Sequence, residues 1–203
     1  MPFRVAIVGL PGSNKTQIID RLSGMLRSQQ FTVKKAKIGT LKDSRNWLSI
    51  IKNCKMGAKS EDKIRSSIFW RLRMRQRFMA FSEDLCKDKN GKETNFILMD
   101  GCIIDWLVYD IFGCGTPREE AEKRVGKFTP KEINLVLFID TSHSLIKKCQ
   151  NFQQEGADFI RRVADGYKKF AEEKKLIAIN SQNKGIQEIT QECSKNIIQE
   201  YYQ

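Results

Sequence analysis

The feature that most constrains this chain is an eight-residue stretch near its N-terminus, from Gly9 to Thr16. It reads GLPGSNKT, which matches the phosphate-loop pattern G-x-x-x-x-G-K-[ST] except where Asn14 replaces the last glycine. A short apolar run at 3–8 precedes the loop, and a segment with helical spacing at about 15–30 follows it. This strand, loop and helix order would place backbone amides around phosphate groups at a helix N-terminus.

The loop predicts a site for ATP and Mg²⁺. Lys15 would contact the outer phosphates, and the hydroxyl of Thr16 would be a magnesium ligand. Asparagine tolerates the left-handed conformation better than most non-glycine residues, so Asn14 is compatible with a working loop. The alternative is a glycine-rich turn that only connects a strand to a helix. The residues expected to bind the nucleotide are Gly9, Pro11, Gly12, Ser13, Asn14, Lys15 and Thr16.

Apolar runs and helical segments alternate along the rest of the chain. Further strands are predicted at 31–38, 95–99, 133–139 and 176–179. Helices are predicted at about 15–30, 42–53, 60–87, 103–112, 117–126, 142–153, 157–174 and 184–202. Such alternation indicates an α/β fold with right-handed crossovers. We expect one domain over 1–203, with the three-layer P-loop NTPase fold and a five-stranded parallel sheet flanked by helices.

The charge balance indicates anionic partners. The chain has 36 Lys and Arg residues against 24 Asp and Glu residues, a net charge of +12. A polyphosphate substrate alone rarely needs such an excess, so nucleic acid is a candidate partner. The alternative is a lysine-rich, solvated surface.

Other sequence features bear on location and on metal binding. No apolar window is long enough for a membrane span, and the N-terminal segment lacks the pattern of a signal peptide. Six cysteines form no CxxC pair, and the single histidine, His143, cannot complete a Cys/His zinc set. We therefore expect a cytoplasmic protein with reduced thiols and no membrane partner.

Asp100, at the end of the apolar run 95–99, is a candidate for supporting magnesium, because hard cations prefer carboxylate and water oxygens. The stretch 100–110, DGCIIDWLVYD, resembles a motif of the thymidylate kinase family of nucleoside monophosphate kinases: Asp-Arg-Tyr, then Ser and Ala-Tyr-Gln. The segment 133–140, INLVLFID, looks like that family's fourth strand. The segment 159–167, FIRRVADGY, is similar to the family's helix after the lid.

The resemblance implies a kinase that moves the γ-phosphoryl group of ATP to a nucleotide, and a homodimer. It implies that Asp100 is the magnesium-side or catalytic aspartate and that Tyr109 packs against a deoxyribose. Phe69 and Arg73 resemble a base-stacking Phe and a base-contacting Arg; the alternatives are a core aromatic and a surface charge. The expected acceptor-site residues are Phe69, Arg73, Arg77, Asp105 and Tyr109.

Two departures from the family pattern put the acceptor in question. Gly101 stands where the family has the arginine that grips the acceptor phosphate. The lid-like segment at about 147–158 lacks the family's arginine, so Lys147, followed by Arg161, is expected to stabilise charge on the transferring group. The expected catalytic residues are Lys15, Asp100, Lys147 and Arg161, with Thr16 and Asp100 as metal ligands.

Three functions are compatible with these features. The first is transfer of phosphate from ATP to a (deoxy)nucleoside monophosphate of thymidylate type. The second is a kinase that acts on a nucleoside or on a nucleotide within nucleic acid, favoured by the charge of +12 and the missing arginine. The third is a nucleotide-binding protein without turnover, favoured by the changed loop and lid.

Overall fold

A computed structural model describes residues 1–10, 12–37, 93–113, 115–126, 133–142 and 157–203. Within them, five strands form a parallel sheet in the order β2-β3-β1-β4-β5. The strands are β1 (Phe3–Val8), β2 (Val33–Lys37), β3 (Phe96–Asp100), β4 (Leu135–Asp140) and β5 (Ile177–Asn180). All five predicted strands are present, and the predicted α/β class is confirmed.

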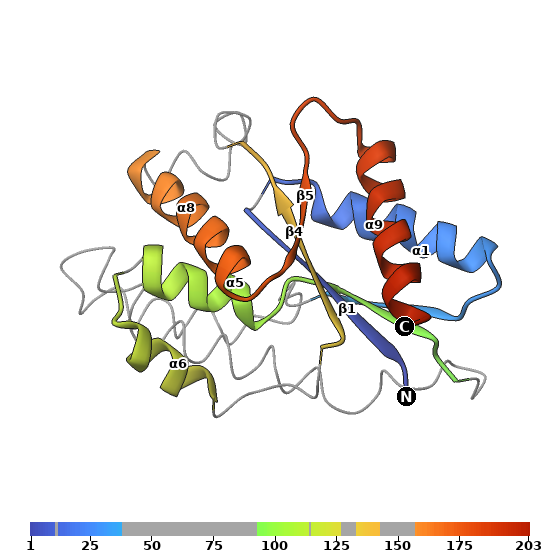
Figure 1. Ribbon diagram of the computed structural model, residues 1–203, viewed down its shortest axis with the longest axis horizontal. Coiled ribbons are helices and arrows are strands. Elements are labelled where there is room, and N and C mark those ends of the chain that lie inside the picture. Colours follow the sequence, from blue (N-terminus) through green and yellow to red (C-terminus); the bar gives the residue numbers. More distant parts are fainter. Residues whose placement is uncertain (11, 38–92, 114, 127–132, 143–156) are drawn as a thin grey trace, which may run out of the picture.

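Helices flank this sheet on both sides (Figure 1). They are α1 (Lys15–Ser28), α5 (Ile103–Val108), the π-helical turn η1 (Tyr109–Gly113), α6 (Arg118–Gly126), α8 (Ala157–Glu173) and α9 (Ile186–Tyr201). The helices predicted at about 42–53 and 60–87, and all but the first residue of 142–153, lie outside the described residues. Among the described helices, none combines the length and apolar character needed to cross a membrane.

The central strand β1 shows why the inner strands β1, β3 and β4 are almost continuously apolar. Successive side chains of a strand point to opposite faces, and both faces of a parallel sheet are covered. Val5 and Ile7 therefore belong to one buried cluster, and Ala6 and Val8 belong to the other. Strand β3 alternates in the same way. Both sides of the sheet thus carry a hydrophobic core.

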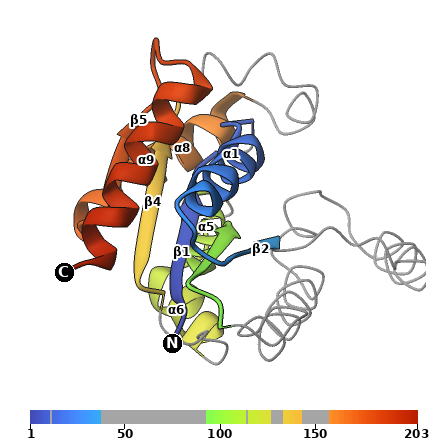
Figure 2. The same ribbon diagram turned by 90° about the vertical axis from the view of Figure 1, so that its right-hand side faces the viewer.

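Helices α1 and α9 cover one face and pack against each other. Leu22 of α1 and Ile197 of α9 are both fully buried in the cluster on this side. At the end of the sheet where both termini lie (Figure 2), Tyr201 of α9 is in ring contact with Phe3 and Phe96, at 5.6 and 4.7 Å between ring centroids. The C-terminal helix is thereby fixed to the start of the sheet by apolar contacts.

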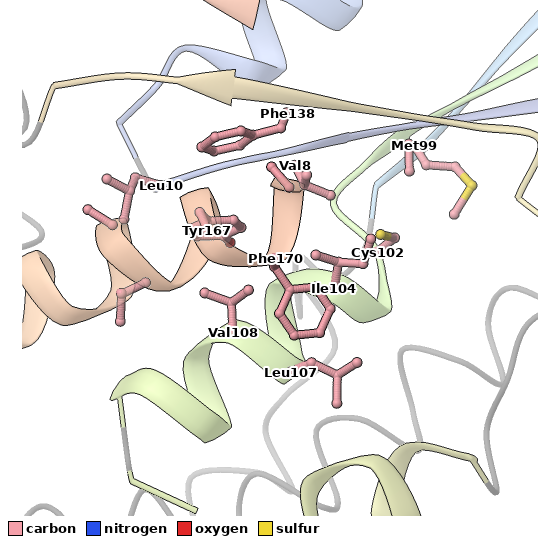
Figure 3. Packing of buried hydrophobic residues seen from close by; sticks show 14 of the residues in the cluster. Val8, Leu10, Met99, Cys102, Ile104, Leu107, Val108, Phe138, Tyr167 and Phe170 are labelled. Atoms are coloured by element: carbon pink, nitrogen blue, oxygen red, sulfur yellow. The ribbon is translucent and has the colours of Figure 1, made fainter. Parts of the chain in front are cut away.

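Helices α5 and α8, with the turn η1, cover the other face. Here Tyr167 and Phe170 of α8 lie with Phe138 of β4 and Val8 of β1 in one cluster (Figure 3). The approach of η1 to α8 is close, since a Cβ atom built on Gly113 would lie 2.8 Å from the ring of Phe159. This packing places α8 against the carboxyl end of β1, where the phosphate loop begins.

Candidate active site

The phosphate loop begins where β1 ends, between the carboxyl ends of β3 and β4. In the parallel register, Ile7 pairs with Asp100 on one side and with Leu137 on the other. Ligands of open parallel sheets bind outside the carboxyl ends of the strands. The predicted nucleotide site therefore lies at the edge of the sheet that this rule favours.

The loop requires its first glycine for two reasons. Gly9 has φ of 146°, a conformation that side-chain-bearing residues rarely adopt, and a Cβ atom there would lie 2.8 Å from the carbonyl oxygen of Ile139. The next turn is held by Ser13, whose amide and hydroxyl both donate to the carbonyl of Leu10, at 3.2 and 2.7 Å. The loop is thus folded tightly against β4.

Asn14 takes the conformation that the last glycine of the motif would need. Its φ and ψ are 58° and 20°, in the left-handed region, as expected from the tolerance of asparagine for that region. It precedes α1, and its side chain makes no capping hydrogen bond to the helix. The first amides of α1 are therefore not capped by Asn14, which suits an N-terminus that receives phosphate.

Lys15 folds back onto the loop that precedes it. Its Nζ donates to the carbonyl oxygens of Gly9 and Leu10, at 2.7 and 2.8 Å. Burial lowers the pKa of this amine below its usual value, and the charges of Asp105 and Asp100 act in the opposite direction. The ammonium group thus lies within the curve of the loop, near two carboxylates.

The two predicted metal ligands lie side by side. The hydroxyl of Thr16, at the start of α1, donates to Oδ2 of Asp100, at the end of β3, over 2.7 Å. Magnesium prefers oxygen ligands and is commonly held by one or two carboxylates together with water and phosphate oxygens. A hydroxyl and a carboxylate at the mouth of a phosphate loop fit that ion, so Thr16 and Asp100 are a suitable donor set.

A second acidic residue, Asp105, lies in the first turn of α5 and faces the loop. Its carboxylate accepts hydrogen bonds from the amide of Gly9, from the amide of Cys102 and from the hydroxyl of Tyr167. Burial raises the pKa of Asp105, while the charge of Lys15 and these hydrogen bonds act to lower it. The described contacts of this side chain are made with the protein's own loop and helices.

Two other predicted site residues lie on the same side of the sheet. Tyr109, the first residue of η1, meets Tyr167 edge to face with ring centroids 6.4 Å apart. Arg161 is exposed near the start of α8, where its guanidinium donates to Asp158 over 3.1 Å. Five further predicted residues or segments, Pro11, Phe69, Arg73, Arg77 and Lys147 with most of the lid-like segment, lie outside the described residues.

A comparison with solved structures identifies the fold. No protein-family model and no curated protein matches this sequence. A thymidylate kinase from Ehrlichia chaffeensis is similar in structure, with a TM-score of 0.62 over 97% of this chain and 98% of that one, at 16% sequence identity. The chain has a thymidylate kinase-like fold. The family resemblance seen in the sequence is thus confirmed at the level of the fold.

Within this thymidylate kinase-like fold, sequence reasoning missed the importance of Tyr167. In the sequence, Tyr167 is only the last residue of the family-like segment 159–167, yet its hydroxyl reaches Asp105, 62 positions earlier. Part of the signal was visible, because Asp105 stands three residues after Cys102, the spacing at which an acidic side chain caps a helix. Nothing in the sequence pairs that carboxylate with a tyrosine on a distant helix.

Proposed function

We propose that this chain is an ATP-dependent P-loop kinase that transfers the γ-phosphoryl group to a nucleotide, with deoxynucleoside monophosphates of thymidylate type as the first candidates. The observation that carries the proposal is the pairing of Thr16 with Asp100, at 2.7 Å, beside the Lys15 ammonium at the carboxyl ends of β1 and β3. The likeness to a thymidylate kinase supports the choice of acceptor class.

Each of these side chains has a role in such a reaction. Lys15 would exchange the carbonyls of Gly9 and Leu10 for phosphate oxygens and stabilise charge on the transferring group. Thr16 and Asp100 would hold Mg²⁺, which neutralises phosphate charge when bound. The loop amides that follow Gly9 would orient the triphosphate. The protein's part is therefore positioning and electrostatic stabilisation.

The test is an ATP-consumption screen over nucleoside and deoxynucleoside monophosphates, nucleosides and oligonucleotides. Replacing Lys15 by alanine should lower consumption by roughly 100-fold or more, the usual loss when a charge-stabilising donor is removed from a transition state. Lys35→Ala is the matched control, since Lys35 is an exposed lysine paired only at the surface with Asp20. Equal rates in parent and Lys15→Ala would contradict the assignment of the site.

The net charge of +12 supports a second candidate, a kinase whose acceptor lies within nucleic acid. Oligonucleotides in the same screen separate the two candidates. Phosphorylation of an oligonucleotide, with binding that weakens steeply as salt rises, would favour the second; consumption with free monophosphates alone would favour the first. ATP binding without transfer to any acceptor would identify a nucleotide-binding protein without turnover.

A further inference from the structure

The carboxyl group of Asp105 joins three elements with its two oxygens. Oδ2 accepts from the amide of Cys102 over 2.8 Å, which caps the start of α5 from the third helical position. Oδ1 accepts from the amide of Gly9 over 3.3 Å and also from the hydroxyl of Tyr167. A helix cap needs only the first of these contacts. The other two connect the phosphate loop to α5 and α8.

Gly101 is shaped by the same carboxyl group. It has φ of 88°, and a Cβ atom on it would lie 2.6 Å from Oδ2 of Asp105. A side chain at position 101 would therefore have to displace Asp105 or move the backbone. The position of the Asp105 carboxyl group thus requires a glycine at position 101.

The tyrosine that completes the link is held firmly. Tyr167 is 1% exposed, and its ring stacks on Phe138 of β4, at 5.5 Å between centroids and 8° between planes. Figure 3 shows the ring of Tyr167 at α8 and the ring of Phe138 above it, beside β4. The preceding residue, Gly166, lies against the ring of Phe112, where a Cβ atom would clash. Close packing on both sides fixes the direction of the Tyr167 hydroxyl.

Gly9 is held from two sides by groups of opposite charge. Its carbonyl accepts from Lys15 Nζ over 2.7 Å, and its amide donates to Asp105 over 3.3 Å. If Lys15 turned toward a triphosphate, the carbonyl of Gly9 would lose this partner. The amide would remain bound to Asp105, because that bond does not involve the lysine. Asp105 can therefore hold the start of the loop both with and without nucleotide.

We propose that Asp105 is a positioning residue that anchors the first residue of the phosphate loop to α5 and α8, through the amide of Gly9 and the hydroxyl of Tyr167. The anchor sets the direction in which the chain leaves β1 and so the place of the loop amides that follow. Its effect on catalysis rests on the proposed function. Its effect on the loop itself does not.

Asp105→Asn is an informative substitution because it keeps the shape of the side chain. Both carboxylate oxygens accept from backbone N–H groups. An amide side chain must turn its own NH₂ toward one of these donors in either orientation, so one of the two contacts is lost. Tyr167→Phe removes only the hydroxyl and leaves the stacked ring, which provides a second variant should Asp105→Asn fail to fold.

The first experiment measures amide hydrogen exchange of residues 9–13 without nucleotide. Loss of a hydrogen bond to a charged group should speed exchange on the order of tenfold in Asp105→Asn, with a smaller change in Tyr167→Phe. The controls are Asp110→Asn, whose carboxylate accepts from Thr116 over 2.6 Å, and Tyr201→Phe at the far end of the sheet. Loop exchange that matches the parent in Asp105→Asn and in Tyr167→Phe would overturn the anchor.

The second experiment measures kcat and KM for MgATP in the same variants. A misplaced loop should raise KM on the order of tenfold in Asp105→Asn, whereas simple destabilisation would reduce the active fraction and leave KM unchanged. If the parent proves active and Lys15-dependent but KM does not move in Asp105→Asn, the anchor does not place the loop for MgATP binding, and the kinase remains. If loop exchange rises in the variants while the parent transfers no phosphate, the anchor remains and the kinase is wrong.

Discussion

The cores on the two faces of the sheet differ in the polar groups that they contain. On the side of α1 and α9, the described core is apolar apart from the buried hydroxyl groups of Ser23, Thr190 and Ser194. On the side of α5 and α8, the apolar cluster surrounds a carboxylate, Asp105, and the buried hydroxyl of Tyr167. Both faces cover the same strands, so the difference does not come from the sheet.

The difference shows which face of the sheet, besides stabilising the fold, also holds the start of the phosphate loop in place. An apolar face stabilises through buried area and tolerates exchange of one hydrophobic residue for another of similar volume. Asp105 is partly buried, and a carboxylate that loses contact with water needs hydrogen bonds in its place. Asp105 receives them from Gly9, Cys102 and Tyr167. The α5 and α8 face, which adjoins the start of the phosphate loop, thus depends on specific hydrogen bonds to Asp105.

Ile197→Ala on α9 provides the largest expected effect. Ile197 is fully buried, so its truncation should lower the free energy of unfolding by about 2–5 kcal/mol through lost burial and a cavity. Ile198→Ala, a change of the same size at the next and only partly buried position, should lower it less. KM for MgATP in the folded protein should stay the same in both variants. A raised KM would show that the α1 and α9 face also positions the loop.

Gly101→Ala tests the other face with an intermediate effect. The new methyl group would meet Asp105 at 2.6 Å in a strained backbone conformation, so unfolding should become easier by about 1–3 kcal/mol. Gly115→Ala is the matched control, because Gly115 also has positive φ, 71°, but among the described residues beyond its chain neighbours no atom lies within 4 Å of the added Cβ. Faster amide exchange at residues 9–13 is expected for Gly101→Ala only. Equal exchange in the two variants would show that a side chain at position 101 does not disturb the loop.

The strands and the loop were predictable because their signals are local. Four of the five strands are short, mostly apolar runs that end at a glycine or a polar residue, as a covered parallel sheet requires, whereas β2 reads VKKAK. The loop motif has a fixed spacing and is preceded by a strand and followed by a helix. The tolerance of asparagine for the left-handed region agrees with the conformation of Asn14, at φ of 58°. Local patterns were thus enough to predict the sheet and the place of the loop at its carboxyl edge.

What the sequence could not provide depends on distant contacts. A continuous helix was predicted at 103–112, but the α-helix ends at Val108 and a π-helical turn follows at Tyr109–Gly113. The spacing of apolar residues does not distinguish a π-helical turn from a continuing α-helix. Here the turn ends at Gly113, which packs against Phe159 on α8. The bond of Tyr167 to Asp105 joins residues 62 positions apart and has no local signature.

The ion pair between α6 and α8, at the surface of the α5 and α8 side, provides the smallest expected effect. Arg118 of α6 binds Glu173 of α8 over 2.6 Å, and its hydrogen bond holds the pKa of Glu173 below the usual 4.5. A carboxyl group whose pKa is lowered by folding adds stability above its unfolded pKa, and that stability is lost as pH falls through the folded value. Glu173→Gln should therefore lower the melting temperature slightly at neutral pH and not at all in strong acid.

Glu172→Gln, one residue earlier and exposed, is the control for removing a charge from the same helix. Both residues of the pair are largely exposed, so added salt should shrink the effect of Glu173→Gln at neutral pH. KM for MgATP should be unchanged, because this pair joins α6 to the end of α8 and makes no contact with Gly9. A change in KM would mean that the docking of α8 as a whole, rather than Asp105 alone, sets the position of the phosphate loop.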